Sequence, residues 1–92
     1  MKTVHKYKLK LTWEEQELQL PFAAKILSIQ IQEGIGLRLW ALVDPALDYV
    51  VRRFRVFGTG YPIPNNTPST YRHLATVQDG GFVWHVFEVT ER

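Results

Sequence analysis

Apolar and polar side chains alternate along most of the chain, a pattern that predicts strands rather than helices. In the segment 6–11, Tyr7, Leu9 and Leu11 fall on one face and three lysines on the other, which is typical of a half-buried strand. The same two-residue period predicts further strands over 17–20, 25–32, 50–57, 71–78 and 82–89. No segment has the 3.6-residue period of a long amphipathic helix.

The segment 37–43 breaks the alternation because it is apolar on both faces apart from Arg38. A strand of this kind is typical of the middle of a sheet, covered on two sides. The dipeptide Asp44-Pro45 ends it, since proline lacks an amide donor and disfavours helical angles in its predecessor. Residues 45–49 are therefore expected to form a loop or a single helical turn.

Turn signals separate these segments. Gly34 and Gly36 favour a tight turn, and Asp79-Gly80-Gly81 is a strong hairpin signal. The strands 6–11 and 17–20 are close in sequence and are expected to form a first hairpin. Six to seven short strands then predict one all-β antiparallel domain over residues 1–92, a meander that forms a sandwich or a partly open barrel.

Composition narrows the possible functions. A chain of 92 residues builds one core, which excludes two-lobed enzymes, and the absence of cysteine excludes disulfides, thiolate nucleophiles and cysteine-based zinc sites. The eleven basic residues exceed the nine acidic ones by only two, a weak field for holding nucleic acid. The charged start and the lack of a long apolar run predict a cytoplasmic protein without membrane contact.

The histidines are the natural place to look for a metal or a general base. A two-residue Gly80-Gly81 turn would pair Thr76 with His85 and His73 with Glu88, which places the two histidines on different faces. A three-residue loop would bring them onto one face. Hairpin preference favours the first register, so we predict no catalytic set, no metal, no cofactor and no enzymatic activity.

The long loop 58–70 follows a strand and opens with Gly58-Thr59-Gly60, but its prolines prevent the helix that a dinucleotide site needs. Long loops in small domains are often functional. At the end of the segment 37–43, Asp44 is expected to face Arg52 or Arg53 across a hairpin as an ion pair. The candidate ligand or interaction surface comprises Trp40, Asp44, Arg53, Arg55, Gly58, Thr59, Gly60, Tyr61, Pro62, Trp84 and His85.

Several segments are distinctive in combination: Lys6-Tyr7-x-Leu9, Ile26-Leu27-Ser28-Ile29-Gln30, Leu39 to Pro45, Arg53-Phe54, Gly58-Thr59-Gly60-x-Pro62-Ile63-Pro64 and Phe82 to Glu88. Together they resemble a family of small uncharacterised phage and prophage proteins. The resemblance implies a viral or prophage origin in a bacterial cytoplasm, with virion association as one setting. The family has no established activity to transfer onto residues.

Three functions are compatible with these observations. The first is a non-enzymatic accessory or structural module that contacts a phage-encoded protein or forms a homo-oligomer through its edge strands. The second is a single-stranded nucleic-acid binder, although Phe54 points away from the neighbouring arginines; its cations would be Lys6, Lys8, Lys10, Arg52, Arg53 and Arg55. The third is a small-molecule binder or hydrolase between the loop 58–70 and Trp84-His85.

Overall fold

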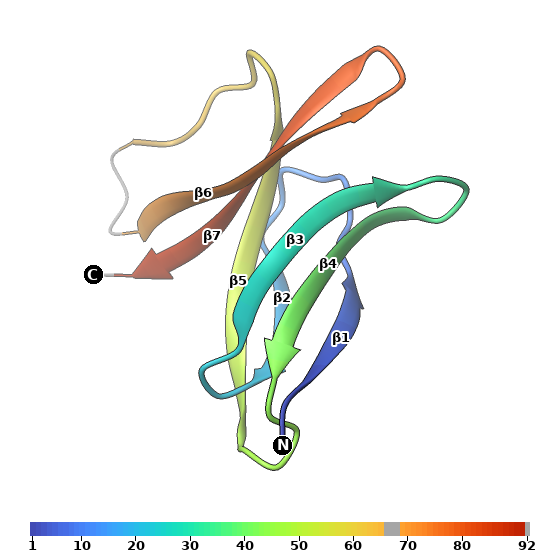
Figure 1. Cartoon of the computed structure of the whole chain (residues 1–92). Coiled ribbons are helices and arrows are strands. Elements are labelled where there is room, and N and C mark those ends of the chain that lie inside the picture. Colours follow the sequence, from blue (N-terminus) through green and yellow to red (C-terminus); the bar gives the residue numbers. More distant parts are fainter. Residues whose placement is uncertain (66–68, 92) are drawn as a thin grey trace.

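The computed structural model describes residues 1–65 and 69–91, so residues 66–68 of the loop 58–70 lie outside the described part. It contains seven strands and, within those ranges, no helix (Figure 1). The predicted all-β antiparallel class is confirmed. The strands are β1 (Thr3–Lys8), β2 (Gln16–Pro21), β3 (Lys25–Gln32), β4 (Gly36–Val43), β5 (Tyr49–Gly58), β6 (Ser69–Asp79) and β7 (Phe82–Glu91).

The strands form two sheets, with the orders β1-β4-β3 and β2-β5-β7-β6. The glycine-turn hairpins β3–β4 and β6–β7 are formed, but the expected first hairpin is wrong, because β1 pairs with β4 and β2 with β5. The chain crosses between the sheets after β1: Leu9 N donates to Leu37 O, and Val56 N donates to Thr12 O. This crossing lets β1 and β2 cover the core from opposite sides.

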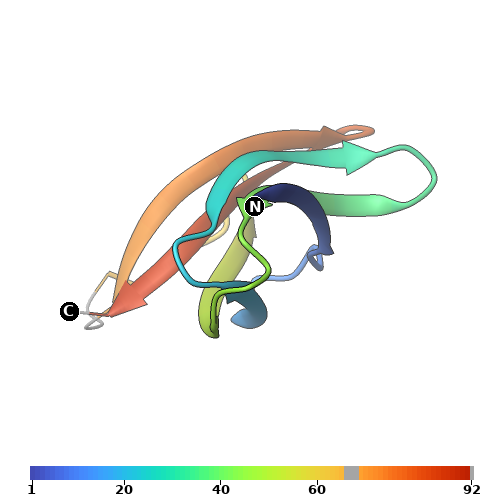
Figure 2. The same ribbon diagram turned by 60° about the horizontal axis from the view of Figure 1, so that its bottom comes forward.

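The core lies between the two sheets, which curl around it without closing into a barrel (Figure 2). At one side, β3 and β6 lie next to each other although they belong to different sheets. Strand β4 is central in its sheet, as predicted, but only its alternate residues are fully buried. The largest completely buried side chains of this core are Phe54, Leu20, Leu37, Leu39, Val43, Val56 and Val86.

The two faces of β5 have different roles. Phe54 and Val56 point into the core, while Arg53, Arg55 and Phe57 alternate with them on the opposite side. We call this opposite side of the β2-β5-β7-β6 sheet the outer face. The predicted separation of Phe54 from the two arginines is confirmed, yet another aromatic residue, Phe57, shares their face.

The hairpin of β6 and β7 has the predicted register near its turn, with Thr76 opposite His85. A bulge between His73 and Ala75 then shifts the pairing by one residue, so that His73 lies opposite Phe87 rather than Glu88. Because one extra residue reverses the side-chain direction, both histidines lie on the outer face. The prediction that they occupy different faces is therefore wrong.

Candidate functional site

A chain of hydrogen bonds crosses the outer face through both histidines. Thr59 Oγ1 lies 2.7 Å from His85 Nε2, and Thr76 Oγ1 lies 3.0 Å from both His85 Nδ1 and His73 Nε2. The two ring nitrogens of His85 are thus both occupied by hydroxyl groups. Over residues 1–65 and 69–91, no carboxylate contacts either histidine and no group of three metal-ligating side chains occurs.

Aromatic rings gather beside this chain of hydrogen bonds. The ring of Phe57 lies 6.0 Å from Tyr61 and 5.9 Å from Phe87, measured between centroids. Trp13 stacks on Tyr61 at 6.2 Å with an interplanar angle of 19°. These spacings are favourable for aromatic pairs, so Tyr61 and Trp13 form a second layer over the sheet.

Four large apolar side chains of this side remain open to solvent. The exposed fractions are 50% for Trp13 and 44% for Tyr61 at one end of β5, and 54% for Tyr49 and 44% for Val51 at the other. Strand alternation places Tyr49 and Val51 on the same face as Arg53. We call the set formed by Trp13, Tyr49, Val51, Arg53, Arg55, Phe57, Tyr61, Tyr71 and Phe87 the aromatic face.

The charges of the aromatic face are largely compensated. Arg53 Nε lies 3.6 Å from a Glu15 carboxylate oxygen and 3.4 Å from one of Glu17. The Arg55 guanidinium carbon lies 5.9 Å from the centroid of the Tyr71 ring, a cation–π distance. Both glutamates therefore contact Arg53, whereas Arg55 contacts the ring of Tyr71, and the face carries both signs of charge.

The structure brings five of the eleven predicted site residues together. Arg53, Arg55, Thr59, Tyr61 and His85 meet on or above the outer face, although their side chains come from β5, the following loop and β7. The proximity of the loop 58–70 to His85 is confirmed by the contact with Thr59. The hollow beside this contact measures about 280 Å³ and is lined by Gly58, Thr59, Gly81, Phe82, Val83 and Trp84.

Gly58 and Gly60, the two glycines of the predicted surface, are favoured at their positions for different structural reasons. Gly58 lies opposite Trp84, and a Cβ on Gly58 would stand 3.4 Å from the indole ring. Gly60 has φ +85°, which a side chain would strain. Pro62 follows on the exposed part of the loop, while Trp84 packs against the core rather than on the aromatic face.

Two predicted residues lie elsewhere. Trp40 lies on the first sheet opposite Lys6, and Asp44 Oδ1 accepts a hydrogen bond from Ala46 N in the turn after β4. The expected ion pair of Asp44 with Arg52 or Arg53 is not formed, because β4 and β5 belong to different sheets. Arg52 instead points into the space between the sheets.

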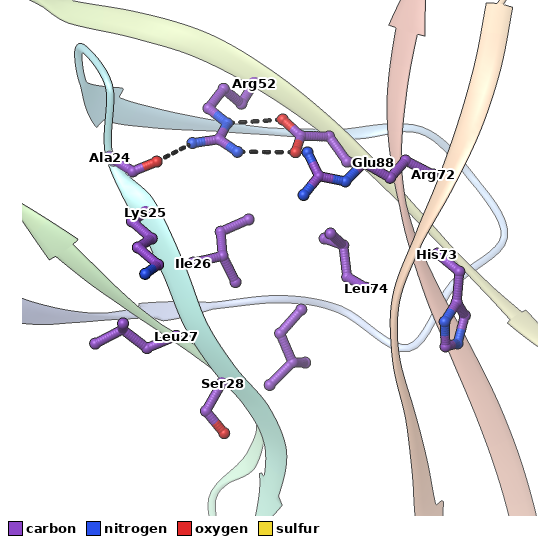
Figure 3. A pocket seen from close by; sticks show the side chains of 11 residues that line it. Ala24, Lys25, Ile26, Leu27, Ser28, Arg52, Arg72, His73, Leu74 and Glu88 are labelled. Atoms are coloured by element: carbon purple, nitrogen blue, oxygen red, sulfur yellow. Dashed lines mark hydrogen bonds and ion pairs between the residues drawn. The ribbon is translucent and has the colours of Figure 1, made fainter.

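A cleft that the sequence did not reveal lies on the inner side, between β3 and β6 (Figure 3). At its end, Arg52 Nε and Nη2 donate to the two Glu88 carboxylate oxygens at 2.7 and 2.8 Å, and Arg52 Nη1 donates to Ala24 O at 2.7 Å. The hydrogen bonds to Glu88 raise the pKa of Arg52 and outweigh the opposing effect of burial. Each residue is charged but stands at a core-facing position of a strand in which apolar and polar residues alternate. This is the one sequence signal for the pair.

All 92 residues match the family model described as Domain of unknown function (DUF7352). The chain belongs to this family. No curated protein and no solved structure matches it. The family match agrees with the expected family of small proteins without assigned activity, but it carries no indication of a phage origin. Over the described ranges of this DUF7352 chain, no helix is long and apolar enough to cross a membrane.

Proposed function

We propose that this DUF7352 domain is a non-enzymatic interaction module that self-associates through its aromatic face. The observation behind the proposal is the solvent-exposed stack of Trp13 on Tyr61, continued along β5 by the exposed Tyr49 and Val51. Large apolar groups gathered on one face mark interaction surfaces. Trp, Tyr and Arg are also the residues on which binding energy at protein interfaces concentrates.

The occupant of this face is a second copy of the same chain. An interface between copies related by a two-fold axis must be complementary to itself. The aromatic face meets this condition, because Arg53 and its partners Glu15 and Glu17 offer both charges side by side. In a dimer, each Arg53 can approach the glutamates of the other copy while the apolar ends of the face exclude water.

Single-stranded nucleic acid fits the same face less well. Stacking on aromatic rings would favour it, but a phosphate backbone needs several cations without carboxylate partners. Arg53 already contacts two glutamates, and Arg52 is engaged in the cleft. Lys6 and Lys8 lie in β1 of the other sheet, opposite Trp40 and Arg38.

The hydrogen-bonded histidines support a structural role. His85 joins Thr59 of the loop to Thr76 of β6, so it anchors the loop two residues before Tyr61. A hydrolase of the Ser-His-Asp type would need an acid to orient the histidine, and the position that such an acid would take is filled by the hydroxyl of Thr76. We therefore propose that this chain of hydrogen bonds holds Tyr61 over Phe57 and performs no reaction.

We place this module in a bacterial cytoplasm and in a phage or prophage context, on the resemblance of the segments 58–64 and 82–88. In that setting it acts as an accessory or structural protein, without cofactor or metal. A phage-encoded partner would add to, and not replace, contact between copies.

Sedimentation velocity from about 5 to about 500 µM tests the proposal, since weak homodimers dissociate in this range. We expect wild-type protein to shift from monomer to dimer, and Trp13→Ala to weaken the dimer at least about tenfold. Phe82→Ala is the matched control. Phe82 is also an exposed aromatic residue, but strand alternation places it on the side of β7 opposite to the outer face.

A wild-type protein that stays monomeric throughout, or a Trp13→Ala variant that dimerises like wild type, contradicts the proposal. Tight binding of oligothymidylate by such a monomer, lost steeply as salt rises, would assign the face to nucleic acid instead.

A further inference from the structure

The cleft between β3 and β6 is a built cavity rather than a gap between ribbons. Its volume is about 420 Å³, and side chains from both sheets enter it (Figure 3). This size lies in the range of about 300–1,000 Å³ that is common for small-molecule sites. The cleft is on the inner side of the second sheet and is therefore separate from the aromatic face.

One wall of the cleft is aliphatic. Ile26 comes from β3, and Leu74 faces it from β6. The register of β3 against β4 shifts between Ile26 and Ser28, so Leu27 has no partner in the ladder and is 48% exposed. A bulge of this kind redirects a side chain, and here Leu27 points to the side of β3 away from Leu74, which leaves Ile26 as the aliphatic group that β3 presents to the cleft (Figure 3).

The other wall is cationic. Glu88 is only 7% exposed, and each oxygen of its carboxylate accepts a hydrogen bond from Arg52. Arg72 lies opposite Glu88 in the ladder and reaches into the cleft beside it. No ion pair or hydrogen bond joins the side chain of Arg72 or Lys25 to any other residue that the structure describes.

We propose that this cleft binds a small aliphatic carboxylate, with the anionic group on Arg72 and the hydrocarbon body against Ile26 and Leu74. The planar guanidinium of Arg72 matches a carboxylate with two parallel hydrogen bonds. Lys25 adds a second positive charge from β3. The Arg52–Glu88 pair closes the end of the cleft and is itself neutral, so it does not repel the ligand.

Octanoate is the probe for the test. Octanol, which has the hydrocarbon chain without the charge, and inorganic phosphate, which has negative charge without the chain, are the two controls. Titrations of the whole chain are followed through the backbone amide signals in two-dimensional NMR spectra. We expect octanoate to bind and to shift the amides of Ile26 and Leu74, while octanol and phosphate each bind at least about tenfold more weakly, which is about 1.4 kcal/mol.

Two variants assign the anion site. Arg72→Gln should weaken octanoate binding at least about tenfold, whereas Arg72→Lys, which keeps the charge but loses the fork, should fall between it and wild type. Lys8→Gln removes an exposed charge from the other sheet and should bind like wild type. Unchanged amide spectra away from the cleft establish that each variant is folded.

Three results would overturn the assignment: no binding of octanoate, equal binding by wild type and Arg72→Gln, or signal changes centred on Trp13 and Tyr61. The last result would assign binding to the aromatic face.

Discussion

Replacing Glu88 by Gln tests how much the ion pair at the end of the cleft contributes to the stability of the fold. The variant keeps the size of the side chain and one acceptor oxygen but removes the charge that faces Arg52. Arg52 would then keep Ala24 O as its second partner. The pair joins β5 to β7, and through Ala24 it reaches the start of β3 in the other sheet.

The expected loss follows from the burial of the pair. Removing one partner of a buried pair costs about 3–5 kcal/mol, but the Arg52 side chain is 21% exposed against 9% for Glu88. Water can therefore solvate part of the orphaned guanidinium, and we expect a loss of about 2–3 kcal/mol in the free energy of unfolding. In a domain of this size the melting temperature should fall by about 10–20 °C.

Urea titrations followed by circular dichroism measure this free energy, with Glu17→Gln as the matched control. Glu17 pairs with Arg53 at 3.4 Å, but the two side chains are 58% and 42% exposed, so its loss should cost less than about 1 kcal/mol. The double variant Arg52→Met with Glu88→Leu should recover most of the stability, because an apolar pair needs no desolvation of charge. Equal losses for Glu88→Gln and Glu17→Gln, or a double variant less stable than Glu88→Gln, would refute the reasoning.

Three further changes probe other parts of the fold. Tyr7→Phe should stabilise the protein by up to about 1 kcal/mol, because the Tyr7 hydroxyl is buried without a hydrogen-bond partner. Burial, and then the charge of Tyr49, raise the pKa of Tyr7. Because the folded state holds this proton more tightly than the unfolded state, the stability of the wild-type protein falls above about pH 10. The advantage of Tyr7→Phe in urea titrations should therefore widen above this pH. Ala23→Gly should raise the melting temperature slightly, since Ala23 has φ +61°; a lower value would contradict this. Leu39 lies in the fully buried centre of β4, so Leu39→Ala should lower the free energy of unfolding by about 2–5 kcal/mol in the same titrations. A loss below about 1 kcal/mol would contradict the position of Leu39 in the core.

The alternating pattern was sufficient for the strands but not for all of their partners. Local pairings with glycine turns, such as β3–β4 and β6–β7, could be predicted because the turn residues specify them. The pairings β1–β4 and β2–β5 join residues that are 28 (Pro21 and Tyr49) to 40 (Thr3 and Val43) positions apart, for which the intervening turns give no signal. Proximity in sequence favoured a hairpin that the crossing between sheets prevents.

The candidate site was predictable to a similar extent. Thr59, Tyr61 and His85 were recognised from the loop and the neighbouring strand, and they do converge. The place of His73 depended on a single bulge, which no hydrophobic pattern reveals. The cleft was missed because Arg52 and Glu88 are distant in sequence, although a charged residue at a core-facing position of an apolar strand is a signal that both share.

The proposal that the aromatic face joins two copies of the chain is tested most directly by the three tryptophan indole signals in NMR spectra of dilute and concentrated protein. Trp13 belongs to the aromatic face, whereas Trp40 lies on the other sheet and Trp84 packs against the core. We predict that the Trp13 signal moves with concentration while those of Trp40 and Trp84 stay fixed. A fixed Trp13 signal, or a change confined to Trp40, would contradict the proposed interface.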